Sequence, residues 1–512
     1  MKFVTKTGRN LALAGAAALT ALTWGADASA TYFVQLATNN EAGITNNGTC
    51  NLSDAIDCVK GGATGTANGA TCTAAHGYHG CGGPPADQYV FLNDTSAPTY
   101  LIGSTQVIPA GVSLFIIGGD LPGDAFIKMT GTGDAFSIAS GATFSTSSLT
   151  ILHNTATAGR GVTNSGTCFI GYTGVADGKV TGTCDATHSS GCGGGIYNNG
   201  SLDIYNSLVY HNSATKGGGI YNTAGASALS IDATTIGGDH YYTDSSGFRG
   251  NTATSDGGGL YNIDGVSVSS ATIITRSVIS DNVSGGVGGG IASYGILGAT
   301  IQNDTISGNK ATSGGGLHSG GRAEITNSTV SGNTATSGGG GGIKVVTGDN
   351  NYLDLFYSTI AFNHSQTAGG GVDLSGAVGT GGNPVRTQTD HSIVAQNTFG
   401  ASNTALDYKG DPQSDVVTRS LFGVTDGILN FQRGVNLVGN PQLAPLAANG
   451  YTQQPLLKTH AIPSTSLAHD QVSNGAPFNQ GSDADERGFG RDCVNPGGLC
   501  DLGAFERQPS DP

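Results

Sequence analysis

The sequence is poor in charge, above all in positive charge. Only 11% of its 512 residues are charged, and 21 Lys and Arg stand against 36 Asp and Glu, which gives a net charge of -15. Binding to nucleic acid requires clustered Lys and Arg that neutralise phosphates. The shortage of these residues therefore argues against nucleic acid as a partner, and it disfavours a polyanionic substrate unless cations mediate the contact. It agrees with an exported protein.

The apolar run at the N-terminus is short. Leu11–Leu22 follows three basic residues and precedes Ala28-Ser29-Ala30, an order typical of a secretory signal peptide. The run is too short and too rich in Ala and Gly for a membrane anchor. We therefore predict a signal peptide at residues 1–30, no transmembrane segment in the mature chain, and a secreted, extracellular protein. The only Trp, Trp24, is removed with the signal, which leaves Tyr as the largest aromatic surface for sugar stacking.

Glycine, by contrast, is abundant, with 86 residues. Triplets of glycine followed by one aliphatic residue begin at Gly193, Gly217, Gly257, Gly288, Gly314, Gly340 and Gly369. Their spacings are 24, 40, 31, 26, 26 and 29 residues, a range typical of solenoids, in which each unit buries its apolar face against its neighbours. Each glycine would cost a helix about 1 kcal/mol, so the pattern excludes a helical solenoid.

A second motif precedes the triplets. Segments such as Asn206–Asn212, Asn303–Asn309 and Asn327–Asn333 contain Ser, Thr, Val and Ile, which favour short strands. They also contain Asn and Gly, which tolerate the left-handed backbone of a tight corner. One Asn at a fixed place in each unit can bond to the next Asn and to the corner backbone. The sequence therefore predicts an all-β fold, a parallel β-helix over residues 88–440.

Nine cysteines in an exported chain favour disulfides. Two similar segments run into glycines, and a third encloses a turn sequence that closes easily. The predicted pairs are Cys72–Cys81, Cys184–Cys192 and Cys493–Cys500.

Other cysteine chemistry is less favoured. The alternative for the first segment is a zinc site formed by Cys72, His76, His79 and Cys81. A predicted helix holds the Cα atoms of Cys50 and Cys58 about 12 Å apart, which is beyond the reach of a disulfide. Because nine is odd, one cysteine stays unpaired, and Cys168 is the candidate.

A β-helix exposes unpaired strand edges at both ends, so it requires caps. We place the N-terminal cap at residues 31–87. Within it, Leu52, Ala55, Ile56 and Val59 fall on one face of a predicted helix.

This cap also carries a resemblance to a known family. The run Cys50–Ile56 reads Cys-Asn-Leu-Ser-Asp-Ala-Ile and resembles the Cys-Ser-Leu-Arg-Glu-Ala-Ile motif of the CSLREA domain, found at the start of exported bacterial β-helix proteins. It departs from that motif at Asn51, Ser53 and Asp54.

The C-terminal segment, residues 441–512, resembles the choice-of-anchor Q domain of the same proteins. The matching residues are Asn440–Leu443, Pro445-Leu446, Asn449-Gly450, Asp485–Gly488 and Cys500–Glu506. The resemblance implies export and a right-handed parallel β-helix of the pectin lyase-like kind, but no single activity. We predict that the Cys493–Cys500 disulfide closes this cap. The repeats are also similar to those of polymorphic outer-membrane proteins. Since the printed chain ends without a hydrophobic sorting tail, we expect free secretion or non-covalent retention at the cell surface.

The residue after the aliphatic position of each triplet should point outward, because side chains alternate along a strand. Coils stack about 4.8 Å apart, so these residues form a column of Tyr197, Tyr221, Tyr261, Ala292, His318, Lys344 and Asp373. Aromatic faces stack on sugar rings, which makes the three tyrosines candidate ligand-binding residues. A Lys beside an acid and an imidazole can abstract a proton next to a uronate carboxyl. His318, Lys344 and Asp373 are therefore candidate catalytic residues.

A second column lies nine residues before the recurring Asn of each unit. It contains Asp203, Tyr242, Ile273, Thr300, Glu324 and Asp354. Glu324 and Asp354 thus belong to adjacent coils, and retaining glycosidases use carboxylates about 5 Å apart. Arg322 can instead neutralise the pair. We predict no cofactor, and a Ca²⁺ site built from such oxygens is the alternative.

Two functions remain open. The first is a monomeric, secreted or surface-associated protein that binds extracellular or cell-surface polysaccharide in adhesion or in a matrix. The second is a polysaccharide lyase or glycoside hydrolase, because unrelated activities share this fold. The low charge, and the lack of a coil with the dense Asp, Arg and Lys cluster that a calcium-dependent lyase requires, favour binding.

Overall fold

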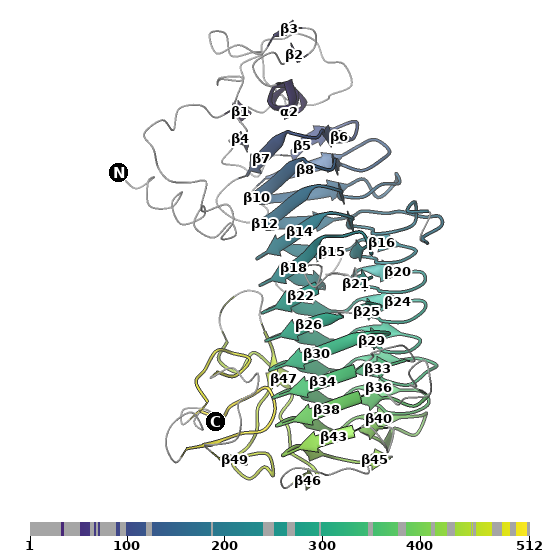
Figure 1. Ribbon diagram of the computed structural model, residues 1–512, viewed down its shortest axis with the longest axis vertical. Coiled ribbons are helices and arrows are strands. Elements are labelled where there is room, and N and C mark those ends of the chain that lie inside the picture. Colours follow the sequence, from purple (N-terminus) through teal and green to yellow (C-terminus); the bar gives the residue numbers. More distant parts are fainter. Residues whose placement is uncertain are drawn as a thin grey trace.

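The computed structural model is a right-handed parallel β-helix, as the repeats predict (Figure 1). The structure describes residues 32–34, 52–61, 66–67, 70–71, 89–92, 99–118, 125–185, 188–238, 250–263, 272–295, 298–346, 352–376, 386–410, 415–426, 436–451, 453, 457–473, 484–491 and 498–508. Within these residues, strands from successive coils pair in parallel and form one sheet of 24 strands, one of 12 and one of 8, the last of which ends in a single antiparallel pair. The interior is filled by one continuous row of aliphatic and aromatic side chains.

A full coil contains four short strands. The first strands are β14 (Ser201–Tyr205), β18 (Ala228–Asp232), β22 (Thr272–Thr275), β26 (Ala299–Gln302), β30 (Arg322–Thr326), β34 (Tyr352–Phe356), β38 (Arg386–Asp390) and β43 (Asp415–Thr418). The second strands are β15 (Leu208–Tyr210), β19 (Thr235–Gly237), β23 (Val278–Ser280), β27 (Thr305–Ser307), β31 (Thr329–Ser331), β35 (Thr359–Ala361), β39 (Ile393–Ala395) and β44 (Leu421–Phe422). First and second strands belong to the largest sheet.

The other two sheets are built from the third and the fourth strands. The third strands are β16 (Ser213–Ala214), β20 (Thr252–Ala253), β24 (Val283–Ser284), β28 (Lys310–Ala311), β32 (Thr334–Ala335), β36 (His364–Ser365) and β40 (Thr398–Phe399), which pairs with β41 (Thr404–Ala405). The fourth strands are β6 (Gln106–Ile108), β9 (Phe136–Ile138), β11 (Val162–Asn164), β13 (Ile196–Asn198), β17 (Ile220–Asn222), β21 (Leu260–Asn262), β25 (Ile291–Ser293), β29 (Leu317–Ser319), β33 (Ile343–Val345), β37 (Val372–Asp373), β42 (Tyr408–Lys409) and β45 (Thr425–Asp426).

A single left-handed residue separates the first strand from the second. Positive φ angles between 42° and 59° occur at Ser148, Tyr172, Asn206, Ala233, Arg276, Asn303, Asn327, Tyr357, His391 and Arg419. Asn accepts this conformation most readily. The presence of other residue types at the same corner shows that stacking on the neighbouring coils imposes it.

The predicted asparagine ladder occupies the corner between the second and third strands. It contains Asn212, Asn251, Asn282, Asn309, Asn333, Asn363 and Asn397. Nδ2 of Asn309, for example, donates to Oδ1 of Asn333 at 3.0 Å and to the carbonyl of Ile279 at 2.9 Å. Asp407 ends the ladder by accepting from the backbone and side-chain amides of Asn397. The side chains thus satisfy corner groups that lie away from water.

A second asparagine ladder, which we did not predict, follows the fourth strands. Nδ2 of Asn164 donates to Oδ1 of Asn198 at 2.8 Å, Asn198 to Asn222 at 2.7 Å, and Asn222 to Asn262 at 2.8 Å. It continues to Ser293.

The glycine triplets are required by close approach between coils. The first glycine is left-handed, with φ of 63° at Gly217. The second lies against the next coil, where a Cβ on Gly218 would lie 2.4 Å from the carbonyl oxygen of Gly258. No side chain fits at that distance, which explains why the triplet recurs in each coil.

A helix packs against the first coils. Helix α2 (Leu52–Gly61) buries Leu52, Ala55, Ile56 and Val59, which is the predicted face, in the same core as the β-helix. The strands of these coils are β1 (Tyr32–Val34), β4 (Tyr89–Leu92), β5 (Thr99–Ile102), β7 (Ser113–Ile117), β8 (Phe126–Met129), β10 (Thr143–His153) and β12 (Thr167–Ala176). A separate pair is formed by β2 (Thr66–Ala67) and β3 (Ala70–Thr71). Long strands β10 and β12 each span the places of a first and a second strand.

The C-terminal segment also packs along the side of the β-helix. Strand β46 (Leu437–Val438) pairs with β44, and the chain then returns beside the earlier coils, as the yellow trace in Figure 1 shows. Two short pairs, β47 (Leu446–Ala447) with β48 (Thr459–His460) and β49 (Val472–Ser473) with β50 (Leu499–Cys500), lie within it. We call its described part, residues 436–508, the C-terminal lobe. The sequence did not suggest this lateral position.

Polar contacts attach the lobe to the second strands and the corner before them. Nη2 of Arg491 donates to Oδ1 of Asn327 at 2.7 Å, and His460 is hydrogen-bonded to Ser331 at 2.8 Å. Both oxygens of Glu486 accept from threonine hydroxyls, at 2.8 Å from Thr305 and 2.5 Å from Thr329. The Glu486 carboxyl is therefore buried between the lobe and the coils.

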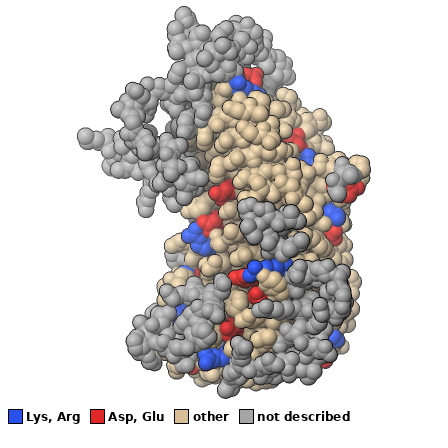
Figure 2. Space-filling view, viewed as in Figure 1, with Lys and Arg blue, Asp and Glu red and all other residues tan. Residues whose placement is uncertain are grey.

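Charge is sparse on the surface, as the composition requires. In the view of Figure 2, acidic and basic side chains form a few small mixed groups separated by uncharged surface. Among the described residues, no helix is long and apolar enough to cross a membrane.

We predict that Asn309→Ala destabilises the β-helix by about 2–4 kcal/mol, because it leaves at least two buried backbone groups unpaired at about 1–3 kcal/mol each. The neighbouring exposed Lys310→Ala is the control. Urea unfolding followed by circular dichroism measures both. A loss for Asn309→Ala no larger than that for the control would contradict the structural role of the ladder.

The attachment of the C-terminal lobe to the coils should weaken as pH rises. Burial, and then the neighbouring Asp304 and Asp485, raise the pKa of Glu486 well above its ordinary value, against the lowering effect of Thr329 and Thr305. A carboxyl whose pKa is higher in the folded state than in the unfolded state stabilises the fold while it is protonated. Its contribution to the free energy of unfolding is therefore complete below the pKa of the unfolded state, and it is lost as pH rises through the pKa of the folded state.

Glu486→Gln should remove this pH dependence. Hydrogen exchange of residues 457–473 between pH 5 and pH 9 provides the measurement, and wild type is expected to exchange faster at high pH beyond the intrinsic effect of pH on exchange. Identical corrected profiles for wild type and Glu486→Gln would refute the assignment.

Candidate functional site

The structure aligns the predicted column on the fourth strands. Tyr197 pairs with Tyr221 and Tyr221 with Tyr261 in the register of β13, β17 and β21. The register continues through Ala292 to His318, and then through Lys344 to Asp373. We call these seven residues the fourth-strand column.

The aromatic rings of the column stack on one another. The ring centroids of Tyr197 and Tyr221 lie 5.8 Å apart with planes 6° from parallel, and those of Tyr221 and Tyr261 lie 5.0 Å apart at 8°. Tyr294 continues the row, 5.5 Å from Tyr261 and 5.8 Å from His318. Sequence reasoning missed Tyr294. It follows Ala292 by two residues, so strand periodicity places it on the same side, where it fills the space that the small alanine leaves.

These rings point away from the core but are not all exposed. Tyr221 is 4% exposed and Tyr261 7% exposed, whereas Tyr197 and Tyr294 are half-buried. Burial, and then the charge of Asp256, raise the pKa of Tyr261 to about 12. In the middle of the column, stacking uses the ring faces that a sugar would need. Only the two ends of the tyrosine stack, Tyr197 and Tyr294, offer partly open rings.

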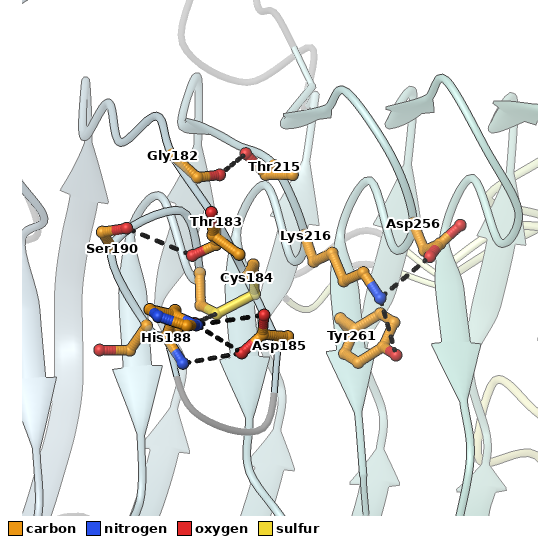
Figure 3. Close-up of a disulfide and its surroundings, with 12 residues drawn as sticks. Gly182, Thr183, Cys184, Asp185, His188, Ser190, Thr215, Lys216, Asp256 and Tyr261 are labelled. Atoms are coloured by element: carbon orange, nitrogen blue, oxygen red, sulfur yellow. Dashed lines mark hydrogen bonds and ion pairs between the residues drawn. A yellow bond between two sulfur atoms is a disulfide. The ribbon is translucent and has the colours of Figure 1, made fainter.

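A disulfide loop, drawn in Figure 3, packs in one cluster with the middle of the column. Cys184 and Cys192 are bonded, as predicted, and pack in one apolar cluster with Tyr221, Tyr261 and Ala292. The loop that follows Cys184 is braced by hydrogen bonds from the His188 backbone and ring to the carboxylate of Asp185. The middle of the outward column is therefore buried in an apolar cluster with the disulfide, which simple alternation along a strand does not reveal.

The other cysteine predictions are only partly within the described residues. Cys168 is buried and free, as predicted, and burial raises the pKa of its thiol. Cys500 is disulfide-bonded, while its predicted partner Cys493 lies outside the described residues. The predicted Cys72–Cys81 pair and its zinc alternative also lie outside them.

Two cations lie over the rings, and each has an acidic partner. The Arg160 guanidinium is 5.3 Å from the Tyr197 ring centroid and pairs with Asp134 at 3.2 Å. The Lys216 amine is 4.9 Å from the Tyr261 ring centroid and 3.5 Å from Asp256, the contact drawn in Figure 3. The column is thus bordered by neutralised ion pairs.

The polar end of the column brings the predicted catalytic residues together. Nζ of Lys344 donates to Oδ2 of Asp373 at 2.9 Å and to the carbonyl of Ser375 at 2.8 Å. His318 is 6% exposed, and burial lowers its pKa to about 4, so its imidazole is neutral at pH 7. Within the described residues its Nδ1 has no hydrogen-bond partner. Lys344 is occupied as a donor, so the group suited to accept a proton is His318.

The carboxylate pair is also adjacent. Glu324 pairs with Asp354 in the register of β30 and β34, and Asp354 is buried. Arg322, however, forms an ion pair with Glu324 at 2.6 Å and lies over the Tyr352 ring at 4.5 Å. The ion pair with Arg322 is the alternative to a catalytic carboxylate pair that the sequence left open.

One member of that second column was wrong. In the register of β14, β18 and β22, Ser230 stands between Asp203 and Ile273. Tyr242, the residue expected there, lies outside the described residues. The long repeat adds residues between β19 and Asn251, so counting back from Asn251 does not reach β18.

Within the described residues, one group has the composition of a metal site. His469, Asp470 and Asp501 hold their ligand atoms within 4.8 Å of one another. Oδ1 of Asp501 already accepts from the Asp470 backbone at 2.8 Å, and Oδ2 from the Arg507 backbone at 2.7 Å. These bonds account for the buried carboxylate as a loop brace, without an ion.

The fold defines the class: this is a right-handed parallel β-helix protein. No protein-family model matches the sequence, and no curated protein matches it. Among solved structures, the A-module of mannuronan C-5 epimerase AlgE6 from Azotobacter vinelandii is similar at a TM-score of 0.37 and 13% identity, over 69% of this chain and 91% of that one. Pectate lyase Pel9A is similar at a TM-score of 0.33 and 12% identity, over 82% and 88%. These scores are too low to carry an argument about activity.

Removing the disulfide should uncover the tyrosine stack. In Cys184→Ser/Cys192→Ser, the loop loses its closure and Tyr221 gains solvent. We expect faster nitration of Tyr221 and Tyr261 by tetranitromethane, measured by peptide mass spectrometry. Tyr357, buried far along the β-helix, is the internal control. An unchanged rate at Tyr221 would show that the disulfide does not hold the cover in place.

Proposed function

We propose that this protein is a secreted or surface-associated β-helix that binds polysaccharide through Tyr197 and Tyr294, the partly open rings at the two ends of the tyrosine stack. The best support is the stacked row of tyrosines, whose two end rings, Tyr197 and Tyr294, are half-buried and so partly open to solvent. It runs along the axis of a rigid solenoid, which suits an extended ligand.

The chemistry of the row fits a sugar polymer. The half-buried rings of Tyr197 and Tyr294 offer apolar surface on which the apolar face of a sugar ring can pack. The ion pairs Arg160–Asp134 and Lys344–Asp373 add donors and acceptors in fixed positions. Groups that are already ordered bind at lower entropic cost.

The charges favour a neutral polymer. Each cation along the column has an acidic partner, and the whole chain carries a net charge of -15. A polyanion would face repulsion without an unpaired cation to attract it.

The test is retention of the protein by immobilised dextran, galactan and galactomannan. We expect Tyr197→Ala/Tyr294→Ala to bind about thirtyfold more weakly, since each of the two aromatic contacts contributes on the order of 1 kcal/mol. Tyr352→Ala, on the first-strand face, is the matched control. Failure of wild type to bind any of these polymers would end the proposal.

A second candidate is a polysaccharide lyase or glycoside hydrolase. The neutral, buried imidazole of His318 beside the Lys344–Asp373 pair supports it, because a neutral imidazole can remove a proton while the ammonium stabilises the resulting anion. For hydrolysis, the adjacent Glu324 and Asp354 are the candidate carboxylates.

Incubation with alginate, pectate and the neutral polymers distinguishes these reactions from binding. A lyase produces the ultraviolet absorbance of unsaturated ends, and a hydrolase produces reducing ends alone. If the protein is a lyase, His318→Asn should abolish the absorbance while binding persists. If incubation with the wild-type protein changes neither the absorbance nor the number of reducing ends, both reactions are ruled out for these polymers and the binding proposal stands.

A further inference from the structure

A second group of aromatic and charged residues lies on the outer face of the first strands. Tyr172 stands at the left-handed corner inside β12, and Tyr205 ends β14 in the next coil. Asp203 lies two residues before Tyr205, Asp232 ends β18, and Arg276 follows β22. None of these five residues belongs to the fourth-strand column, which lies on another sheet.

The two tyrosines meet in a different way from those of the column. The rings of Tyr172 and Tyr205 lie 5.7 Å apart at 70°, so the edge of one ring faces the other. An edge-on contact does not use both ring faces, whereas the parallel stack of Tyr221 and Tyr261 does. Both rings of the edge-on pair are half-buried, which leaves part of their surface to solvent.

The charged members form a fixed fork. Nε of Arg276 donates to Oδ1 of Asp232 at 2.9 Å, and Nη2 contacts Oδ2. The hydroxyl of Thr275 also donates to Oδ1, at 2.8 Å. The Arg276 side chain is 52% exposed. A bidentate pair of this kind has a defined geometry and still presents unused N–H groups.

Ionisable groups next to the Arg276–Asp232 pair are partly shielded from solvent. Burial raises the pKa of Asp203, with the Ser230 hydroxyl opposing the shift and the charge of Asp232 adding to it. Burial, and then the neighbouring Tyr172, raise the pKa of the Tyr205 phenol. Ionisable groups with shifted pKa values that gather around one place are typical of binding sites.

We propose that Tyr172, Tyr205, Asp203, Asp232 and Arg276 form a separate binding site for a neutral saccharide. The rings contact the apolar face of a sugar, the guanidinium donates to its hydroxyls, and the carboxyl groups accept from them. Two acids against one base make the site unsuitable for an anion. The proposal rests on the polysaccharide-binding function, and it gives the polymer a second contact on a different face of the same rod.

The site places its groups on adjacent coils, which matches a ligand that extends along the axis. Tyr172, Tyr205 and Asp232 come from three successive coils, and Arg276 from the fourth. A chain of linked sugars meets these groups in turn, so losing one group weakens binding without removing it.

The experiment measures the dissociation constants of wild type, Tyr205→Ala and Asp232→Asn on the neutral polymer, among dextran, galactan and galactomannan, that wild type retains best. We expect each variant to bind about tenfold more weakly. Arg276→Lys keeps the charge but loses the fork, and it should also bind more weakly. Tyr352→Ala, on the same face further along the rod, is the matched control. Thermal unfolding shows that each variant is folded.

A second readout separates contact from structural damage. The bound polymer should slow nitration of Tyr172 and Tyr205 in wild type, while Tyr352 reacts at its free rate. Unchanged affinity in Tyr205→Ala and Asp232→Asn, together with weakened binding in Tyr197→Ala/Tyr294→Ala, overturns this site and keeps the proposed function. No binding by wild type overturns both. Weak binding by the variants without protection of Tyr172 and Tyr205 also overturns the site.

Discussion

The structure depends on hydrogen bonding between identical corners of successive coils. At the corner after each second strand, one buried asparagine bonds to the asparagine of the next coil and to a carbonyl of the coil before, as Asn309 does with Asn333 and Ile279. These bonds replace the water that the corner backbone would otherwise need. They hold neighbouring coils in one register, and every column of side chains on the outer faces follows from that register.

Because the coils stay in register, equivalent positions of the repeat form continuous columns on the surface. At positions where neighbouring coils come close together, few residue types fit. The triplet that begins at Gly217 must remain glycine, because a Cβ on Gly218 would clash with the carbonyl oxygen of Gly258 in the next coil. Variation is left to the outward positions. There the tyrosines become a stack, the acids acquire basic partners, and the sparse charges form small mixed groups. This surface is the one on which our proposal of an uncharged, extended ligand rests.

How far the sequence reaches can be judged from particular residues. The strand-and-corner pattern of Asn303–Asn309 predicted the ladder, and alternation after the triplets placed Tyr197, Tyr221 and Tyr261 in one column. The same reasoning failed for Tyr242, because the extra residues of the long repeat shift the count. It also missed Tyr294, since that residue lies beyond the strand position from which the column was read. Counting residues along the sequence predicts which positions lie next to each other in adjacent coils only while the repeats have the same length.

By itself, then, the sequence determined the parallel β-helix, the helix that packs on its first coils and the Cys184–Cys192 bond, because each depends on contacts between neighbouring units or within one short segment. Only the tertiary structure decided what is accessible. The disulfide packs against Tyr221, the C-terminal lobe buries Glu486 against Thr305 and Thr329, and Arg276 joins Asp232 across coils. Those contacts join residues that are far apart in the chain, or they depend on side-chain conformations that the sequence does not predict. Burial depends on the whole chain at once, so no local pattern encodes it.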